Sequence, residues 1–458
     1  MCLLAGFAAL SACAHIDTQR IDPAQTLGAL DRRSLSDPGL SSFLQKNHAQ
    51  PPGLQWGVDS LALVACYFNS NLQEGWAHLD EIRAGEKTAE EVPNPSLVVT
   101  PAYDNQIPGN PTPWSLIPLS IDFPIETAGK RGDRRAKAAY LSQAEAWMLA
   151  GQLWQSRSDV RAACVELSFS RQRESLLNLK EAAQANVVRL LEGQVHAGAI
   201  SGSELTQARI ALANARIEAG DERARVSGGV QGLASALGLP RSVVVDLPLA
   251  PLAVDGAAVP RDPSALRRRA LVGRADVRQA LAEFAAAQSA LQLEVDNQYP
   301  DIHLGPGYQY NSGSAGDNQW QLSLGITLPV FNHNQGPIAE AKAKRAEAAA
   351  HFLTVQAKAA AEVDAAIAGF EIARKRIEDA QTLSNGLAEG RKQARARSEA
   401  GDADPLAAHL ADEEYYTGAI ARLDAEEAAI RAAGRLEDAL HEGRPPPPNP
   451  PSAQQPRS

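Results

Sequence analysis

The stretch WSLIPLSIDFPIETAGKRGDRRAKAAY, residues 114–140, begins as a strand and ends as a helix. Every odd position from Ile117 to Ile125 is apolar, and the polar residues Ser120 and Asp122 stand between them. An alternation with a period of two predicts a β-strand with one apolar face. After Pro124 the sequence becomes charged and rich in alanine, which is typical of a helix. A strand therefore passes into a helix with almost no break.

The same junction occurs a second time, in WQLSLGITLPVFNHNQGPIAEAKAKRA, residues 320–346. Pro124 corresponds to Pro329, a separation of 329 − 124, or 205 residues. Three further pairs keep the same order at separations of 203–206 residues: Pro95 with Pro300, Trp114 with Trp320, and Gly198 with Gly401. Four ordered landmarks indicate a tandem duplication. Two similar strand–helix junctions in one large α+β protein are the alternative.

The composition of the 458-residue chain points to long packed helices rather than to several compact cores. Aromatic residues make up 5% of the chain and Met occurs twice, while Ala, Glu, Gln and Arg are abundant. The net charge of −10 argues against a protein that binds nucleic acid. The four Cys show no CxxC spacing, so they predict neither a zinc site nor a disulfide framework.

The N-terminal segment MCLLAGFAALSAC predicts export from the cytoplasm. Its end, Leu10 to Cys13, resembles a bacterial lipobox, in which the Cys is acylated and becomes the first mature residue. We therefore expect a signal peptide over residues 1–13 and lipidation at Cys13. Ala14 follows the Cys, which favours delivery to the outer membrane. An ordinary secretory signal with an incidental Cys is the alternative.

Breaker residues divide the rest of the chain into an ordered series of elements. We expect an extended arm over 14–55, a first repeat over 56–239, a Pro-rich connector over 240–262, a second repeat over 263–442 and a disordered tail over 443–458. Each repeat has the order helix, strand, strand, long helix, helix. The predicted first-repeat elements are helices from 56 to about 84, 132–197 and 203–237, and strands over 97–103 and 114–125. In the second repeat we expect a helix from 263, strands from 301 and 320, a long helix from 337 and a last helix ending near 441.

The helix over 203–237 carries a heptad repeat of mostly small apolar residues, which predicts a left-handed coiled-coil seam. Its members are Leu205, Ala208, Leu212, Ala215, Ala219, Glu222, Val226, Gly229, Leu233 and Ala236. The partner helix is far longer than a compact domain needs. About 65 helical residues span roughly 100 Å, so the helices predict an extended assembly.

The strands have the length and the alternation of strands that cross a membrane at a tilt. Aromatic residues lie at both ends of the predicted strands, as in the two girdles of an outer-membrane barrel: Trp114, Trp320, Tyr308 and Tyr310 at one end, Phe123 and Phe331 at the other. Four strands cannot close a barrel, and open edges are not tolerated in lipid, so two, three or four chains must share one barrel. A soluble sheet with one wet face is the alternative.

Together the duplicated order and the two joint sequences, PIETAGKR over 124–131 and PVFNHNQG over 329–336, resemble the outer-membrane efflux protein family, the TolC family. The resemblance covers roughly residues 56–441 and is nearest to the lipoprotein branch that serves heavy-metal and drug efflux of the resistance-nodulation-division type. It implies a homotrimer with a twelve-stranded β-barrel that continues into a long α-helical periplasmic tunnel. It also implies a passive exit duct joined to a periplasmic adaptor and an inner-membrane pump.

The two turns between paired helices are the candidate functional sites that this resemblance implies. Small residues at the turns suit contact with adaptor tips: Gly198, Gly202, Ser203 and Gly401. Glu399, Asp402 and Asp404 are candidates for an acidic constriction. Helix N-capping ahead of Pro405 is the alternative role for Asp402 and Asp404, with Asp404 favoured.

Other classes of protein fit the sequence less well. A periplasmic adaptor carries one hairpin flanked by lipoyl-like halves, and a structural coiled-coil lipoprotein has no strand pairs. No catalytic constellation is present, since AISGSEL is not GxSxG and GPGY over 305–308 is no phosphate loop. We expect no enzyme activity, no cofactor and no metal site. His303 and His333 are expected to be strand-end or turn residues, and Cys66 and Cys164 small buried residues.

Overall fold

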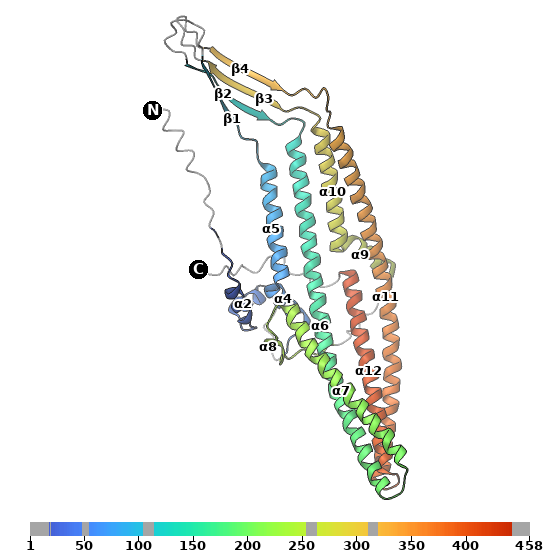
Figure 1. The fold of residues 1–458 in the computed structure, drawn as a ribbon. Helices are drawn as coiled ribbons and strands as arrows, with labels where there is room; N and C mark the ends of the chain where they lie inside the picture. Colours follow the sequence, from blue (N-terminus) through green and yellow to red (C-terminus); the bar gives the residue numbers. More distant parts are fainter. Residues whose placement is uncertain are drawn as a thin grey trace.

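The computed structural model describes residues 18, 20–47, 55–103, 114–252, 263–309 and 319–441. The molecule is elongated, with a small sheet at one end and two helical hairpins at the other (Figure 1). The helices are α2 Pro23–Asp31, α3 Pro38–Lys46, α4 Val58–Phe68, α5 Ser70–Glu90, α6 Lys130–His196, α7 Gly202–Leu237, α8 Arg241–Val244, α9 Pro263–Gly273, α10 Ala275–Asp296, α11 Gln335–Glu399 and α12 Pro405–Leu440. The strands are β1 Ser96–Tyr103, β2 Trp114–Ile125, β3 Ile302–Gln309 and β4 Gln319–Ile326.

The predicted order of elements is present, with three differences. The arm over 14–55 is not extended where it is described, because Asp22 and Asp37 cap α2 and α3 and a proline opens each helix. The first predicted helix breaks at Asn69 into α4 and α5. The helix from Pro263 likewise breaks before Ala275 into α9 and α10.

The four strands form one antiparallel sheet in chain order, β1-β2-β3-β4. The register places apolar residues opposite one another, as with Phe123 and Leu304 or Leu304 and Leu324. Since directly opposed residues share a face, one face of the sheet is apolar. The other face carries Ser120, Asp122, His303, Gly305, Gly307, Gln321 and Ser323. The alternation read from residues 114–140 is therefore the pattern of a two-faced sheet.

Glycine on the polar face makes room for side chains from the next strand. A Cβ on Gly305 would lie 2.1 Å from Ser323 Oγ, and that hydroxyl donates a hydrogen bond to the Gly305 carbonyl oxygen at 2.9 Å. The Ser323 side chain thus lies over β3. Only glycine at position 305 permits this close approach.

Each second strand of a pair turns into a long helix through a residue with a left-handed backbone. Gly129 (φ 82°) precedes α6, and Asn334 (φ 59°) precedes α11. At the first joint the buried Lys130 donates from Nζ to the Tyr299 carbonyl oxygen (2.7 Å) and to Asp301 Oδ1 (2.8 Å). These bonds hold the base of α6 against the start of β3, so the two repeats are joined where the sheet meets the helices.

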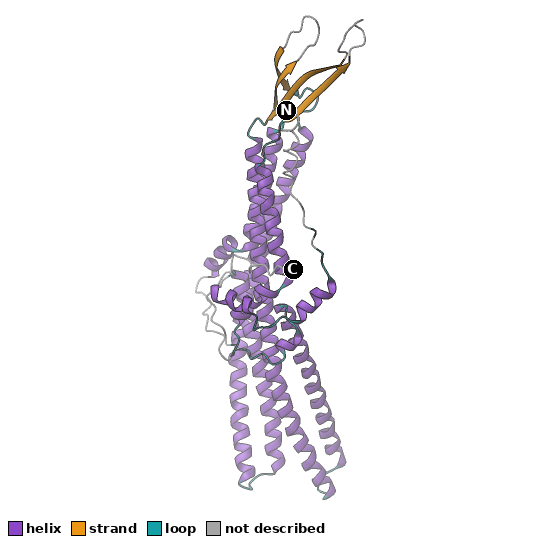
Figure 2. Cartoon of the chain, turned by 90° about the vertical axis from the view of Figure 1, so that its left-hand side faces the viewer, coloured by secondary structure: helices purple, strands orange, loops and turns teal. Residues whose placement is uncertain are grey.

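The wall of the molecule is a layer of helices built around α6 and α11. Toward the sheet α6 packs against α5 and α10, and toward the far end it packs against α7 and α12. α11 packs in the same way against α10 and α12. The side view in Figure 2 shows the helices continuing from the sheet to the tips. Of the ten predicted heptad residues in α7, eight are buried and only Val226 and Ala236 are half-buried.

In the first repeat the end of α7 meets the start of α5, and an arginine joins the two helices. α7 ends at Gly238 against the start of α5. There Arg33 Nη1 donates to the carbonyl oxygens of Phe68 (2.7 Å) and Gly238 (2.8 Å). Asn69, the N-cap of α5, donates from its amide to the Ala236 carbonyl oxygen at 3.3 Å. The two helices therefore follow one another along α6.

The second repeat has an equivalent junction between α12 and α10. Arg274 donates to the Ala439 carbonyl oxygen at 3.1 Å and pairs with Asp276 and Glu362 at 2.8 and 2.7 Å. The backbone N–H of Ala275 donates to His441 Nδ1 at 3.3 Å. We call these two meeting points, at Arg33 and at Arg274, the helix splices.

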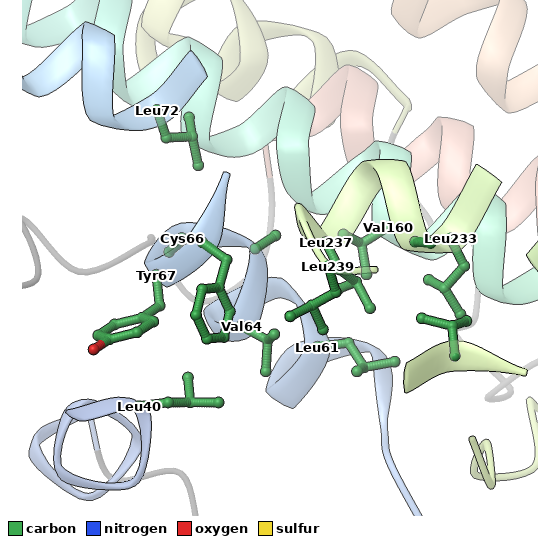
Figure 3. Packing of buried hydrophobic residues seen from close by; sticks show 14 of the residues in the cluster. Leu40, Leu61, Val64, Cys66, Tyr67, Leu72, Val160, Leu233, Leu237 and Leu239 are labelled. Atoms are coloured by element: carbon green, nitrogen blue, oxygen red, sulfur yellow. The ribbon is translucent and has the colours of Figure 1, made fainter. Parts of the chain in front are cut away.

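The largest hydrophobic core lies at the first splice, where α3, α4, α5, α6 and α7 meet. Figure 3 shows Leu40, Leu61, Val64, Leu233 and Leu237 gathered in it. Leu40, Leu61, Leu233 and Leu237 are fully buried. Burying each such side chain stabilises the fold by about 1.5–3 kcal/mol. The N-terminal arm is thus part of the core through α3.

Replacing Gly238 is expected to weaken the first splice. An alanine would have to hold φ at +68°, and its Cβ would lie 2.7 Å from the Phe68 carbonyl oxygen. The left-handed backbone alone costs roughly 1–2 kcal/mol, so Gly238→Ala should lower the unfolding temperature of the purified protein. Gly232→Ala is the control, because Gly232 lies in open space within α7. That change should stabilise the helix by about 0.5–1 kcal/mol. Equal changes of the unfolding temperature in the two variants would contradict the role of Gly238 in the splice.

A second prediction concerns the carboxyl pair of Asp133 and Asp296 below the sheet. Burial, followed by the hydrogen bond and charge of Asp296, raises the pKa of Asp133 to about 6. A carboxyl group whose pKa is raised in the folded state destabilises the fold as pH rises from its ordinary pKa of about 4 through about 6. Asp133→Asn should flatten this dependence and raise the unfolding temperature at neutral pH. Asp221→Asn, at an exposed site on α7, is the control and should leave the pH dependence of the unfolding temperature unchanged. If Asp133→Asn kept the pH dependence of the parent protein, the raised pKa of Asp133 would be refuted.

Candidate functional site

The aromatic residues at the end of the sheet farthest from the helices lie on adjacent strands. Tyr308 is opposite Trp320, with ring centroids 5.0 Å apart, and Trp320 is 84% exposed. Trp114 is opposite Tyr103 at the same end of the sheet. Tyr310 lies outside the described residues. The topology thus brings the described residues of this predicted girdle, Trp114, Tyr308 and Trp320, to one end of the sheet.

Phenylalanines occupy the opposite end, next to the helices. Phe123 lies on the apolar face of β2 and is 41% exposed. Phe331 lies beyond the end of β4 and is 94% exposed. Trp320 and Phe331 are therefore large aromatic side chains that this chain alone leaves uncovered. An exposed apolar band of this kind requires a covering medium or partner.

The basic side chains that follow β2 are paired with oxygen atoms of neighbouring residues. Lys130 is buried at the joint, as described above. Arg134 binds both oxygens of Glu126 (2.5 and 3.1 Å), and Arg135 pairs with Glu90 at 2.9 Å. The first cause of the raised pKa of Arg134 is its hydrogen bond to Glu126. Lys130 thus holds α6 to the start of β3, Arg134 holds the loop after β2, and Arg135 joins α6 to α5, so these residues are not a free basic patch.

The two hairpin turns lie together at the far end of the molecule (Figure 1). Gly198 and Gly401 both have a left-handed backbone, with φ of 71° and 78°. Gly202 begins α7, and the hydroxyls of Ser203 and Ser201 are 2.6 Å apart. The four predicted contact residues are exposed at the tips. Their position is suited to meeting another protein end-on.

Asp404 links the two tips in addition to capping a helix. Its Oδ1 accepts a hydrogen bond from the Leu406 backbone N–H at 2.9 Å, which makes Asp404 the N-cap of α12. Its Oδ2 accepts a hydrogen bond from Gln194 Nε2 on the first hairpin at 3.0 Å. Glu399 and Asp402 are exposed in the same turn region. The capping role foreseen for Asp404 is therefore present, and three carboxylates lie close in sequence at this tip.

Sequence reasoning missed the buried charge clusters inside the helical wall. Asp412 accepts hydrogen bonds from Arg391 and Arg395 at 2.7–2.9 Å. Burial alone would raise the pKa of Asp412, but the two guanidinium groups outweigh it and hold the pKa below its usual range. Arg173 similarly bridges Asp424 and Glu427 of α12. One feature of the sequence could have indicated the cluster at Asp412: an acidic residue stands within an apolar stripe of the helix.

The remaining candidates have structural surroundings. His303 Nδ1 lies 2.9 Å from Asp122 Oδ2 on the polar face of the sheet, and His333 lies in the exposed turn before α11. Cys66 and Cys164 are buried, as predicted, and burial raises the pKa of each thiol to about 12. Cys13 lies outside the described residues.

Within the described ranges, no three or more His, Cys, Asp or Glu side chains gather as a metal site. In the same ranges, no helix has an apolar stretch long enough to span a bilayer.

Comparison with known proteins agrees with this architecture. The chain is 28% identical to the cobalt-zinc-cadmium resistance protein CzcC of Cupriavidus metallidurans over 284 residues, which is 61% of this chain and 64% of that protein. The match thus spans less than two thirds of this relative. VceC of Vibrio cholerae superimposes with a TM-score of 0.69 at 18% identity, covering 84% of this chain and 96% of that one. CusC superimposes with a TM-score of 0.68 at 18% identity, covering 85% and 94%.

The family comparison covers both halves of the molecule. The model of the outer membrane efflux protein family matches residues 68–239 and 266–441. These segments run from the end of α4 to the end of α7 and its cap, and from α9 to the cap of α12. Together they exceed half of the chain, and the chain therefore belongs to the outer membrane efflux protein family.

Proposed function

We propose that this protein is the outer-membrane channel of a tripartite efflux system and serves as a passive exit duct. One observation carries the proposal: a sheet with one apolar face and two open edges passes directly into long helices. On the apolar face Leu322 and Leu324 are 69% and 64% exposed in the single chain. Lipid is the medium in which such a face is stable.

Three copies of the chain would complete the barrel. In each chain β1 pairs with β2 and β4 pairs with β3 within the described sheet, so β1 and β4 are its outer strands. Unpaired backbone groups cost several kcal/mol each in hydrocarbon, and the edges must therefore close on other copies. Twelve strands from a homotrimer satisfy this requirement, and the family relationship favours three copies over two or four.

The helices would continue the duct into the periplasm. The wall of one protomer has α7 and α11 at its two sides, since α6 and α12 lie between them. Three such walls would close into a tunnel. The exposed tips with Gly198, Gly202, Ser203 and Gly401 would meet a periplasmic adaptor, which in turn would connect the duct to an inner-membrane pump. We propose that Cys13 carries the lipid anchor.

The cargo proposal rests on the relatives. CzcC is named for resistance to cobalt, zinc and cadmium, so we propose divalent metal ions as cargo, with organic drugs as the alternative. Family membership favours a duct over an adaptor or a structural lipoprotein. No catalytic step is assigned to any residue.

A charge on the apolar face tests the barrel and the export function together. Leu322→Arg should prevent insertion, because an arginine facing lipid near the bilayer midplane costs about 2–4 kcal/mol. Gln321→Arg is the matched control, since Gln321 is the adjacent residue on the polar face. In a strain lacking the gene, the parent and Gln321→Arg should restore outer-membrane trimers and resistance to zinc and cobalt, and Leu322→Arg should not. Equal performance of the two variants would contradict a lipid-facing sheet.

Neutralising the tip carboxylates tests the acidic constriction. Three copies of Glu399 and Asp402 would attract cations at the tunnel entrance, so Glu399→Gln with Asp402→Asn should bring the cation-over-anion permeability ratio in planar bilayers toward unity. Glu378→Gln is the control, about 30 Å further along α11. A loss of selectivity in the control alone, or in neither variant, would rule out a constriction at this tip.

A further inference from the structure

The two repeats carry a histidine–glutamate pair at corresponding positions, with the two residue types exchanged. In the first repeat His78 is on α5 and Glu145 is on α6, with Nε2 and Oε2 3.6 Å apart. In the second repeat Glu283 is on α10 and His351 is on α11, with Oε2 and Nε2 3.9 Å apart. The separations, 283 − 78 and 351 − 145, are 205 and 206 residues, the spacing of the duplication. Each pair therefore joins a short helix to a long helix at the same level of the wall.

The ring nitrogens of His78 have different partners. Nδ1 lies 3.3 Å from Glu81 Oε2 on the same helix, and Nε2 is directed to Glu145. When Nδ1 carries the ring proton and donates to Glu81, Nε2 presents a lone pair to the carboxylate. Two electron-pair donors then oppose each other at 3.6 Å. A positive charge between them would remove this repulsion.

Glu145 is a half-buried carboxylate with an unsatisfied oxygen, and the side chain of His78 beside it is 46% exposed. The Glu145 side chain is 11% exposed, and Oε1 has no hydrogen-bond partner within the described part of the chain. Burial, partly offset by the charge of His78, raises its pKa. Glu145 lines a cavity of about 440 Å³ together with His78, Gln152 and Ser156, and Ser156 Oγ also lacks a partner there. The cavity therefore has room and polar groups for a hydrated ion.

We propose that each pair binds one divalent transition-metal cation, such as Zn²⁺, through the histidine Nε2 and the glutamate carboxylate. Zinc ligands about 2.0–2.2 Å from the metal stand roughly 3.4 Å apart at a tetrahedral angle. The observed 3.6 and 3.9 Å are near this separation and too long for a hydrogen bond. Glu81 orients His78 in the way that carboxylates orient metal-ligating histidines.

The second pair, on α10 and α11, has a similar distance but is more open to solvent, with the side chains of His351 and Glu283 56% and 36% exposed. Glu283 Oε1 accepts a hydrogen bond from Gln279 Nε2 at 2.9 Å, which leaves Oε2 toward His351. With two protein ligands and water completing the shell, both sites bind a cation that can exchange. A bound cation would fasten α5 to α6 and α10 to α11 between the sheet and the splices. This inference goes beyond the proposed duct function and does not require a closed trimer.

Zinc binding to the purified full-length protein in detergent tests the proposal. After removal of metal at neutral pH, titration with zinc chloride should show about two ions per chain and a rise in the unfolding temperature. His78→Ala and His351→Ala should each lose one ion, and the double variant should lose both. Glu145→Gln should lose the first ion while keeping the fold, because a neutral amide of the same shape suits a half-buried position.

His333→Ala is the matched control, since His333 is exposed in a turn, and it should bind zinc as the parent does. No uptake by the parent, or uptake unchanged in the double variant, overturns the proposal. Stabilisation by mild acid without any response to zinc also overturns it, because the pairs would then be bridged by a protonated imidazole facing Glu81 and Glu145, or Glu283. These readouts involve no transport, so their failure is distinct from failure of the duct.

Discussion

The architecture depends on one constraint: the backbone at the edge of a sheet cannot remain unpaired in hydrocarbon. The sheet of this chain has an exposed apolar face, on which Leu322 and Trp320 lie, and outer strands that pair on one side only. For this reason we propose that several copies, and not a single one, form the inserted state. The direct passage from β2 into α6 and from β4 toward α11 ties the position of each helix to the strand before it. The proposed closing of the sheet would consequently arrange the helices as well.

The helical part has a different requirement. Its long helices form a wall only one helix thick, so neighbouring helices must stay aligned along their whole length. Apolar burial contributes at the first splice, where α3, α4, α5, α6 and α7 converge. Elsewhere the wall has smaller apolar clusters between α9, α11 and α12, between α6 and α7, and between α6 and α12. Charged groups also reach between helices, as Arg173 does toward Asp424 and Glu427. Such charge pairs add little net stability, because desolvation offsets much of their attraction. The wall thus combines several apolar clusters with directional polar contacts.

The local pattern of the sequence was sufficient for much of this arrangement. Period-two alternation predicts β2 and β4, and the small-residue heptad predicts the buried side of α7, including the acidic Glu222. The capping residues of α2 and α3 were overlooked because the arm is short and polar. The splices, the cluster at Asp412 and the pairing of His78 with Glu145 arise from residues far apart in the chain. Tertiary contacts create them, so no local period signals them.

The first splice has a consequence for the order of folding. Arg33, near the start of the chain, binds the carbonyl oxygen of Gly238, which lies 205 residues later. The arm therefore cannot finish docking until α7 has been synthesised and brought alongside α5. Closing a loop of this length is entropically costly and slow. Arg274 and the Ala439 carbonyl oxygen close a second such loop of 165 residues. Each half of the molecule can therefore complete its splice only after the segment between the two partners has been synthesised.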